Sequence, residues 1–147
     1  IQDERKILMK KFIKCSFLYF LAAMAAGVFY REFTKFSGFE GNTVLADMHV
    51  HLMALGMLFF LLAAMLYKNL KLTGNKAFGR FFVIYNVGLP LLAVTMLTRG
   101  IVQVKGIELS RGMNGMLSGF AGISHILLLL ALLFFFSALK QGVATEE

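Results

Sequence analysis

The chain has 147 residues, of which 59% are hydrophobic and 16% are charged. Soluble domains are about 45–50% apolar and about 25% charged, so this composition excludes an ordinary soluble domain and indicates an integral membrane protein. One Cys and one Pro in the whole chain exclude a disulfide framework and a proline-rich disordered polymer. The formal net charge of +7 comes from basic residues beside apolar segments, where they set membrane orientation, so we expect no nucleic acid partner.

Four apolar segments are long enough to cross the hydrocarbon core of a bilayer, which takes about 20 helical residues. Within lipid each segment must satisfy its own backbone polar groups, so each is expected to be a helix. The sequence therefore predicts an all-α integral membrane fold, a four-transmembrane-helix bundle that makes up one domain over residues 1–147. The predicted helices cover residues 12–30, 44–67, 81–99 and 113–139.

The first two helices each leave one question about their ends. A basic start before an apolar run also fits a secretory signal, and residues 23–27 are small enough for cleavage. The run is longer than a signal core of about 7–15 residues, so we interpret it as a membrane helix. Asn42 and Thr43 are candidate caps of the second helix, which puts His49 and His51 inside it.

Basic residues predict the orientation of the bundle. Ten Lys and Arg residues flank the helices on the side of the chain termini, and five flank them on the other side. Because cytoplasmic loops carry the excess of basic residues, we expect both termini in the cytoplasm. The prediction is a multi-pass protein of the bacterial cytoplasmic (inner) membrane, whose basic side contacts anionic lipid headgroups of the bilayer.

All three His residues lie inside predicted helices, where ionisable groups are rare and mark functional sites. His51 lies 17 residues before Lys68 and His125 lies 15 residues before Lys140. The two depths therefore differ by about 3 Å, in helices that run in the same direction. Two imidazoles at one level near the outer face match the two opposed nitrogens of a bis-His haem, so we predict His51 and His125 as ligands of haem iron.

His49 is expected to serve a different place from His51. Two residues apart in a helix means about 200° of rotation, so the two imidazoles point to opposite faces. His49 is then a second haem ligand, a ligand at a subunit contact, or a hydrogen-bonded structural residue. Haem propionates need cationic partners near the membrane surface, and Arg99 and Arg111 of the outer loop region are the candidates.

Small residues gather near His125 on the last helix. Such residues let a flat cofactor approach closely, and they equally let a neighbouring helix pack there. Both interpretations stay open from the sequence. The residues are Gly115, Ser118, Gly119, Ala121 and Gly122.

A family resemblance rests on His49-Val50-His51, followed by Ala-Leu-Gly at residues 54–56 and Met-Leu-Tyr at residues 65–67. This helix resembles the tenth helix of haem-copper oxidase catalytic subunits, most closely the C-family enzymes, and the whole chain looks like one four-helix arc of such a subunit. The resemblance implies that His49 binds a high-spin haem and His51 a low-spin haem on the opposite face of the helix.

The resemblance also limits what one chain can do. The active-site copper of that family needs several further His ligands, and this chain has only His125 left. One chain therefore does not assemble an oxygen-reducing centre and is not expected to be an enzyme on its own; any activity would be that of an oxidoreductase related to these oxidases. The resemblance implies a self-associating unit, a homodimer or homotrimer.

Three functions stay open from the sequence. The first is a haem b (protohaem) membrane protein that acts in electron transfer or in haem or gas sensing. The second is a protein that handles copper or another metal, because thioether and imidazole ligands together suit Cu(I). The third is a structural accessory subunit. The Met residues near the outer helix ends are Met48, Met53, Met96, Met113 and Met116.

Overall fold

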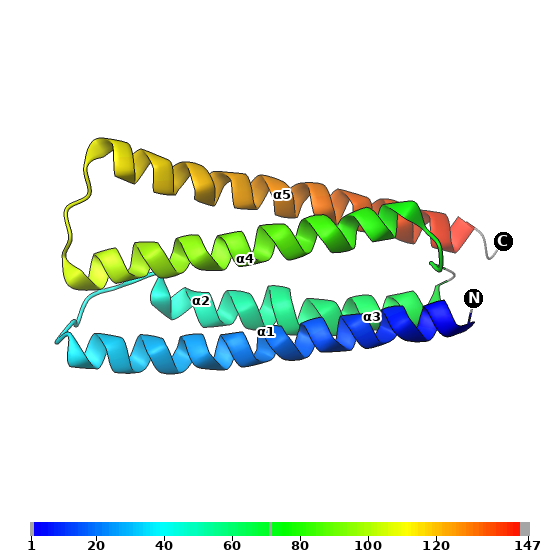
Figure 1. Cartoon of the computed structure of the whole chain (residues 1–147), viewed down its shortest axis with the longest axis horizontal. Helices are drawn as coiled ribbons and strands as arrows, with labels where there is room; N and C mark the ends of the chain where they lie inside the picture. The colour runs from blue at the N-terminus through cyan, green and yellow to red at the C-terminus, as the bar shows by residue number, and fades with distance from the viewer. Residues whose placement is uncertain (1, 71, 145–147) are drawn as a thin grey trace.

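The computed structural model describes residues 2–70 and 72–144, which are almost entirely helical. The elements are α1 (Gln2–Phe36), α2 (Leu45–His51), a π-helix η1 (Leu52–Leu58), α3 (Phe59–Asn69), α4 (Lys76–Lys105) and α5 (Arg111–Ala144) (Figure 1). Because α2, η1 and α3 follow one another without a break, they form one continuous rod. The chain therefore folds as four rods, and the predicted all-α, four-helix architecture is confirmed.

Each rod is longer than the apolar segment that predicted it. For example, α1 starts at Gln2 and ends at Phe36, whereas the expected helix covered residues 12–30. The criterion of apolar length detects only the part suited to hydrocarbon, while the helical hydrogen-bond ladder continues through the polar residues that flank it. All four rods are long and apolar enough to cross a membrane.

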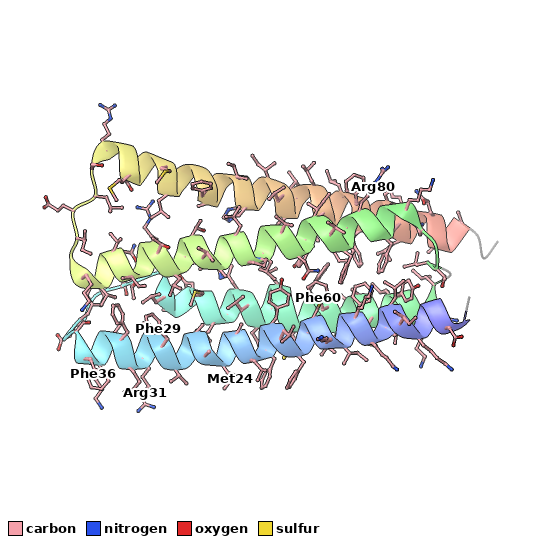
Figure 2. The ribbon with its side chains drawn as sticks, viewed as in Figure 1. Met24, Phe29, Arg31, Phe36, Phe60 and Arg80 are labelled. Carbon is pink, nitrogen blue, oxygen red and sulfur yellow. The ribbon has the colours of Figure 1, made fainter. Side chains whose placement is uncertain are left out.

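The outer surface of the bundle suits contact with lipid. Large apolar side chains such as Val28, Met65 and Val83 are more than half exposed. In Figure 2, Met24 and Arg31 project from the outer side of α1, whereas Phe60 is fully buried inside the bundle. This distribution is the reverse of a soluble helical bundle, whose outer faces are polar.

The four rods form two antiparallel hairpins. The first pairs α1 with the α2–η1–α3 rod and the second pairs α4 with α5, while α4 also packs against α2 and η1. Figure 1 shows the two chain termini at one end of the bundle, which we call the terminus end. The α1–α2 and α4–α5 connections lie at the opposite end, the loop end.

The two ends of the bundle have different cores. Aromatic rings fill the terminus end, where the ring centroids of Phe81 and Phe135 are 4.8 Å apart and those of Phe12 and Phe82 are 5.1 Å apart. Toward the loop end the buried cluster consists of smaller or flexible side chains, namely Ala23, Ala26, Met48 and Leu52. The loop end therefore has less side-chain volume between its helices.

The start of α2 differs in part from the expected cap. The residue before the helix is Val44, whose N–H donates to Gln103 Oε1 at 3.0 Å. Thr43 Oγ1 accepts from the Leu45 N–H at 3.3 Å, and in the described part of the chain Asn42 makes no such bond. The prediction of Asn42 as a cap is therefore wrong, because Gln103 of α4 accepts from the Val44 N–H from outside the helix. His49 and His51 nevertheless lie inside the helix, as predicted.

Close contact between α1 and η1 gives a stability prediction. A Cβ at Gly56 would lie 2.5 Å from Tyr19 Cβ, an atom that cannot move without the backbone of α1. We expect Gly56→Ala to lower the free energy of unfolding by about 1–3 kcal/mol, the usual cost of overpacking. Gly119→Ala is the matched control, since a Cβ there meets nothing within 4 Å. Equal melting temperatures of the two variants in detergent would contradict this contact.

Candidate functional site

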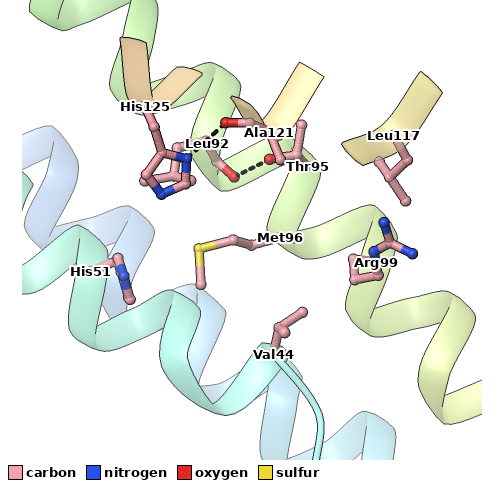
Figure 3. A pocket seen from close by; sticks show the side chains of 9 residues that line it. All are labelled: Val44, His51, Leu92, Thr95, Met96, Arg99, Leu117, Ala121 and His125. Carbon is pink, nitrogen blue, oxygen red and sulfur yellow. Dashed lines mark hydrogen bonds between the residues drawn. The ribbon is translucent and has the colours of Figure 1, made fainter. Parts of the chain in front are cut away.

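A cavity of about 190 Å³ lies toward the loop end, where α2, α4 and α5 meet (Figure 3). Two predicted haem ligands, His51 from α2 and His125 from α5, line it together with Arg99 from α4. The number of residues from each His to the Lys at its helix end predicts two imidazoles at one level, and the structure brings both to one cavity. The other lining residues are Val44, Leu92, Thr95, Met96, Leu117 and Ala121.

Both cavity histidines are oriented by their own helices. His51 Nδ1 donates to the Asp47 carbonyl at 2.9 Å, and His125 Nδ1 donates to the Ala121 carbonyl at 2.7 Å. A carbonyl oxygen can only accept, so Nδ1 carries a proton and Nε2 is the ring nitrogen that could bind a ligand. Metal-binding histidines show this arrangement, in which a hydrogen bond at one ring nitrogen fixes the ring and leaves the other nitrogen as the ligand.

His49 lies away from this cavity, as its rotation relative to His51 predicts. Its ring packs at 3.7 Å from the position that a Cβ of Gly27 would occupy, at the contact between α1 and α2. Of the buried side-chain nitrogen and oxygen atoms in the described chain, His49 Nδ1 alone has no hydrogen-bond partner. A second ligand site or a subunit contact at His49 therefore stays a prediction, separate from the cavity.

The two arginines predicted as propionate partners differ in position. Arg99 lines the cavity, and its guanidinium donates to Asn114 Oδ1 at 2.5 Å and to Ser118 Oγ at 2.9 Å, which links α4 to α5. Arg111 is exposed at the first residue of α5 and does not line the cavity. The structure thus brings Arg99 to the histidines and leaves Arg111 apart.

The glycines near His125 fit neither interpretation within one chain. A Cβ at Gly115, Gly119 or Gly122 would meet no atom within 4 Å, so these residues pack against no other helix of the chain, and none of them is among the residues that line the cavity. Ser118 and Ala121 instead lie on the cavity side, where Ser118 accepts from Arg99 and Ala121 orients His125. The small residues therefore divide between two faces of α5.

Sequence reasoning missed the π-helix that follows His51. The Phe59 N–H donates to the Ala54 and Gly56 carbonyls, so the Leu55 carbonyl between them is free to accept the Tyr85 hydroxyl at 2.8 Å. The π-helix is thus hydrogen-bonded to α4 one turn after His51. π-helical segments occur often at functional sites, and here the segment sets the rotation of His51 relative to the aromatic core. Gly56, in the middle of this helix, is the sequence feature that could have indicated the irregular turn.

Two further residues were not predicted as a set with the histidines, one beside the cavity and one in its lining. Asn114 does not line the cavity but accepts a hydrogen bond from Arg99, which does, and it lies one turn from Ser118 on α5. Met96 was considered only as a possible copper ligand, and it lies among the cavity residues. Among residues 2–70 and 72–144, no cluster of three or more His, Cys, Asp or Glu side chains is placed to hold a metal ion.

The hydroxyl of Tyr85 should support the π-helix. We expect Tyr85→Phe to lower the free energy of unfolding by about 1–3 kcal/mol, because it leaves the Leu55 carbonyl unpaired inside the bundle. Tyr67→Phe is the control: this buried hydroxyl makes only a 3.4 Å contact with Thr73 Oγ1, so a smaller loss is expected. Thermal unfolding of both variants measures the difference, and equal losses would contradict a special role for Tyr85.

One of three comparisons places the chain in a known family. The sequence model of a family described as "Protein of unknown function (DUF2871)" matches residues 9–142, which include most of each of the four rods and every residue that lines the cavity. Neither the search of curated proteins nor the search of solved structures gave a match. Since the family match covers most of its length, the chain belongs to the DUF2871 family.

Proposed function

We propose that this protein binds haem b in the cavity at the loop end, with His51 and His125 as the axial ligands of the iron. The single observation that supports this most is the pair of imidazoles from two different helices that line one cavity with their Nδ1 atoms already bonded. Bound in this way, a haem would supply one-electron transfer, because two imidazoles leave no open position on the iron.

The residues present fit such a group in their chemistry. The bonds from Nδ1 hold each ring in place before any ligand arrives and leave Nε2 as the nitrogen that can bind the iron. Arg99 can bind a propionate at the outer edge of the cavity, since Asn114 and Ser118 already hold its guanidinium there. Most of the remaining lining is apolar, for example Leu92 and Leu117, and suits the apolar face of a macrocycle.

The cavity volume sets a condition on this proposal. About 190 Å³ is less than the roughly 300–1,000 Å³ of usual ligand sites. The space is not closed, however, because His125 is exposed and the glycine face beside it has no neighbour within the chain. A flat macrocycle would therefore have one edge in the cavity and the opposite edge toward lipid or a second copy of the chain.

The wider proposal concerns location and assembly. The excess of Lys and Arg at the terminus end favours that end in the cytoplasm, so the cavity would lie in the outer half of a bacterial inner membrane. The resemblance of the His49–His51 helix to haem-copper oxidases adds support for haem. Self-association as a dimer or trimer would give His49 a partner across the subunit contact. The assembled protein would act in electron transfer or in sensing of haem or a gas.

The first test is a reduced-minus-oxidised absorption spectrum of the detergent-purified protein, with a pyridine haemochrome count per chain. We expect a low-spin b-type spectrum that is lost in His51→Ala and in His125→Ala, because each change removes one axial nitrogen. His49→Ala is the matched control and should keep the low-spin signal. His125→Met should keep haem but raise its midpoint potential, since Met replaces one imidazole.

Several results would overturn the haem assignment. An unchanged spectrum and midpoint potential in both alanine variants would exclude His51 and His125 as ligands. Loss of the signal in His49→Ala alone would reverse the roles of the histidines. A protein that stays colourless after expression with added haem would remove haem altogether.

One observation favours a second candidate function, the binding of Cu(I). Met96 lines the same cavity as the two histidines, and Figure 3 shows its side chain extending from α4 toward His51. Two imidazoles and a thioether are a ligand set that suits Cu(I). Met is also a common apolar filler of helix contacts, so the cavity alone does not separate the two functions.

Met96→Leu distinguishes the two functions because it removes the sulfur and keeps the apolar volume. If copper is the ligand, we expect at least a tenfold weaker Cu(I) affinity in a competition titration. Met113→Leu, an exposed position outside the cavity, is the control and should not change the affinity. If haem is the ligand, Met96→Leu should leave the low-spin spectrum in place. A protein that binds neither group would favour the structural accessory role.

A further inference from the structure

We propose that the groove between α1 and the end of α3 binds the headgroup of an anionic phospholipid. This groove, which we call the basic groove, has a volume of about 510 Å³ and lies at the terminus end, away from the histidine cavity. Its lining includes four cationic side chains and two apolar ones, namely Arg5, Lys6, Lys10, Lys68, Met9 and Ile13.

The described lining of the basic groove carries only positive charge. No Asp or Glu is among the described side chains that line it, and within the described residues no ion pair involves Lys6, Lys10 or Lys68. The one ion pair of the described chain, Arg31 with Glu32, lies near the other end of α1. Several like charges that share one groove repel one another, so an anionic group placed between them is favoured.

The helices hold these cations in a fixed arrangement. Lys6, Lys10 and Ile13 follow the i, i+4, i+7 spacing and therefore share one face of α1. The Arg5 guanidinium donates to the Lys68 carbonyl near the end of α3, which ties the two sides of the groove together. The groove is thus built from two rods and is not a single row of surface lysines.

The apolar side of the groove favours a lipid over a soluble phosphate. Met9 and Ile13 continue from the cations toward the apolar part of α1, and Ile13 is 52% exposed. A phospholipid has a phosphate for the cations and an acyl chain for these side chains. Basic pockets between membrane helices bind anionic headgroups in this way, with roughly 1 kcal/mol for each Lys or Arg near the surface.

The experiment is native mass spectrometry of the full chain, released from nanodiscs that contain phosphatidylcholine and phosphatidylglycerol. We expect selective retention of phosphatidylglycerol, weakened about 10- to 30-fold in the double variant Lys6→Gln, Lys10→Gln. The control is Lys11→Gln, Lys76→Gln, which removes the same charge from exposed residues outside the groove and should retain the lipid. Melting temperatures of both double variants check that they fold.

Three outcomes would overturn the proposal. Equal weakening in the two double variants would indicate a general effect of surface charge, and equal retention of both lipids would exclude recognition of an anion. Displacement of phosphatidylglycerol by millimolar inorganic phosphate would assign the groove to a soluble ligand. None of the substituted lysines lines the histidine cavity, so the haem spectrum tests the two proposals separately.

Discussion

The need to satisfy every backbone polar group without water governs this structure. In lipid an unpaired N–H or C=O costs several kcal/mol, and the four rods, which are long and apolar enough to cross a membrane, pair these groups within helices. The π-helix after His51 departs from the regular hydrogen-bond ladder of an α-helix. Hydroxyl groups from two neighbouring rods donate to its carbonyls. The Tyr85 hydroxyl donates to the Leu55 carbonyl and the Ser16 hydroxyl donates to the Met57 carbonyl at 2.9 Å. One irregular turn thereby fixes α1 and α4 on either side of the second rod.

The position of α4 explains why the cavity and the core differ so much along the bundle. Near the terminus end α4 contributes Phe78 and Phe81 to contacts with aromatic rings of the other rods. Near the loop end it contributes Thr95, Met96 and Arg99, which leave space that α2 and α5 border with histidines. The same helix is thus the centre of the tight core at one end and one side of the candidate site at the other.

Helical periodicity made the main features of the fold predictable. Four apolar segments gave four rods, and the spacing of His49 and His51 gave two different surroundings for the two rings. Depth measured from Lys68 and Lys140 brought His51 and His125 to one level, and they share a cavity.

The remaining features depend on tertiary contacts that periodicity does not encode. Gln103 replaces the expected cap Asn42 from another helix. Tyr85 and Ser16, from two other rods, donate to carbonyls of the π-helix. Arg99 lines the cavity from α4 and donates to Asn114 and Ser118 of α5, whereas Arg111 begins α5 outside the cavity.

The contrast between the two ends of the bundle has a mechanical consequence. At the terminus end interlocked rings resist separation, whereas the first half of α5 has neighbours on one side only, and Gly112, Gly115 and Gly119 add no side chain there. Regions with few buried contacts open at the lowest free energy, so the hairpin of α4 and α5 is stiff at one end and compliant at the other. If the bundle spans a bilayer as proposed, opening of this kind would widen the histidine cavity sideways toward lipid. The proposed ligand would then arrive from the lipid phase, and its partition coefficient rather than its aqueous concentration would set how often the site is filled.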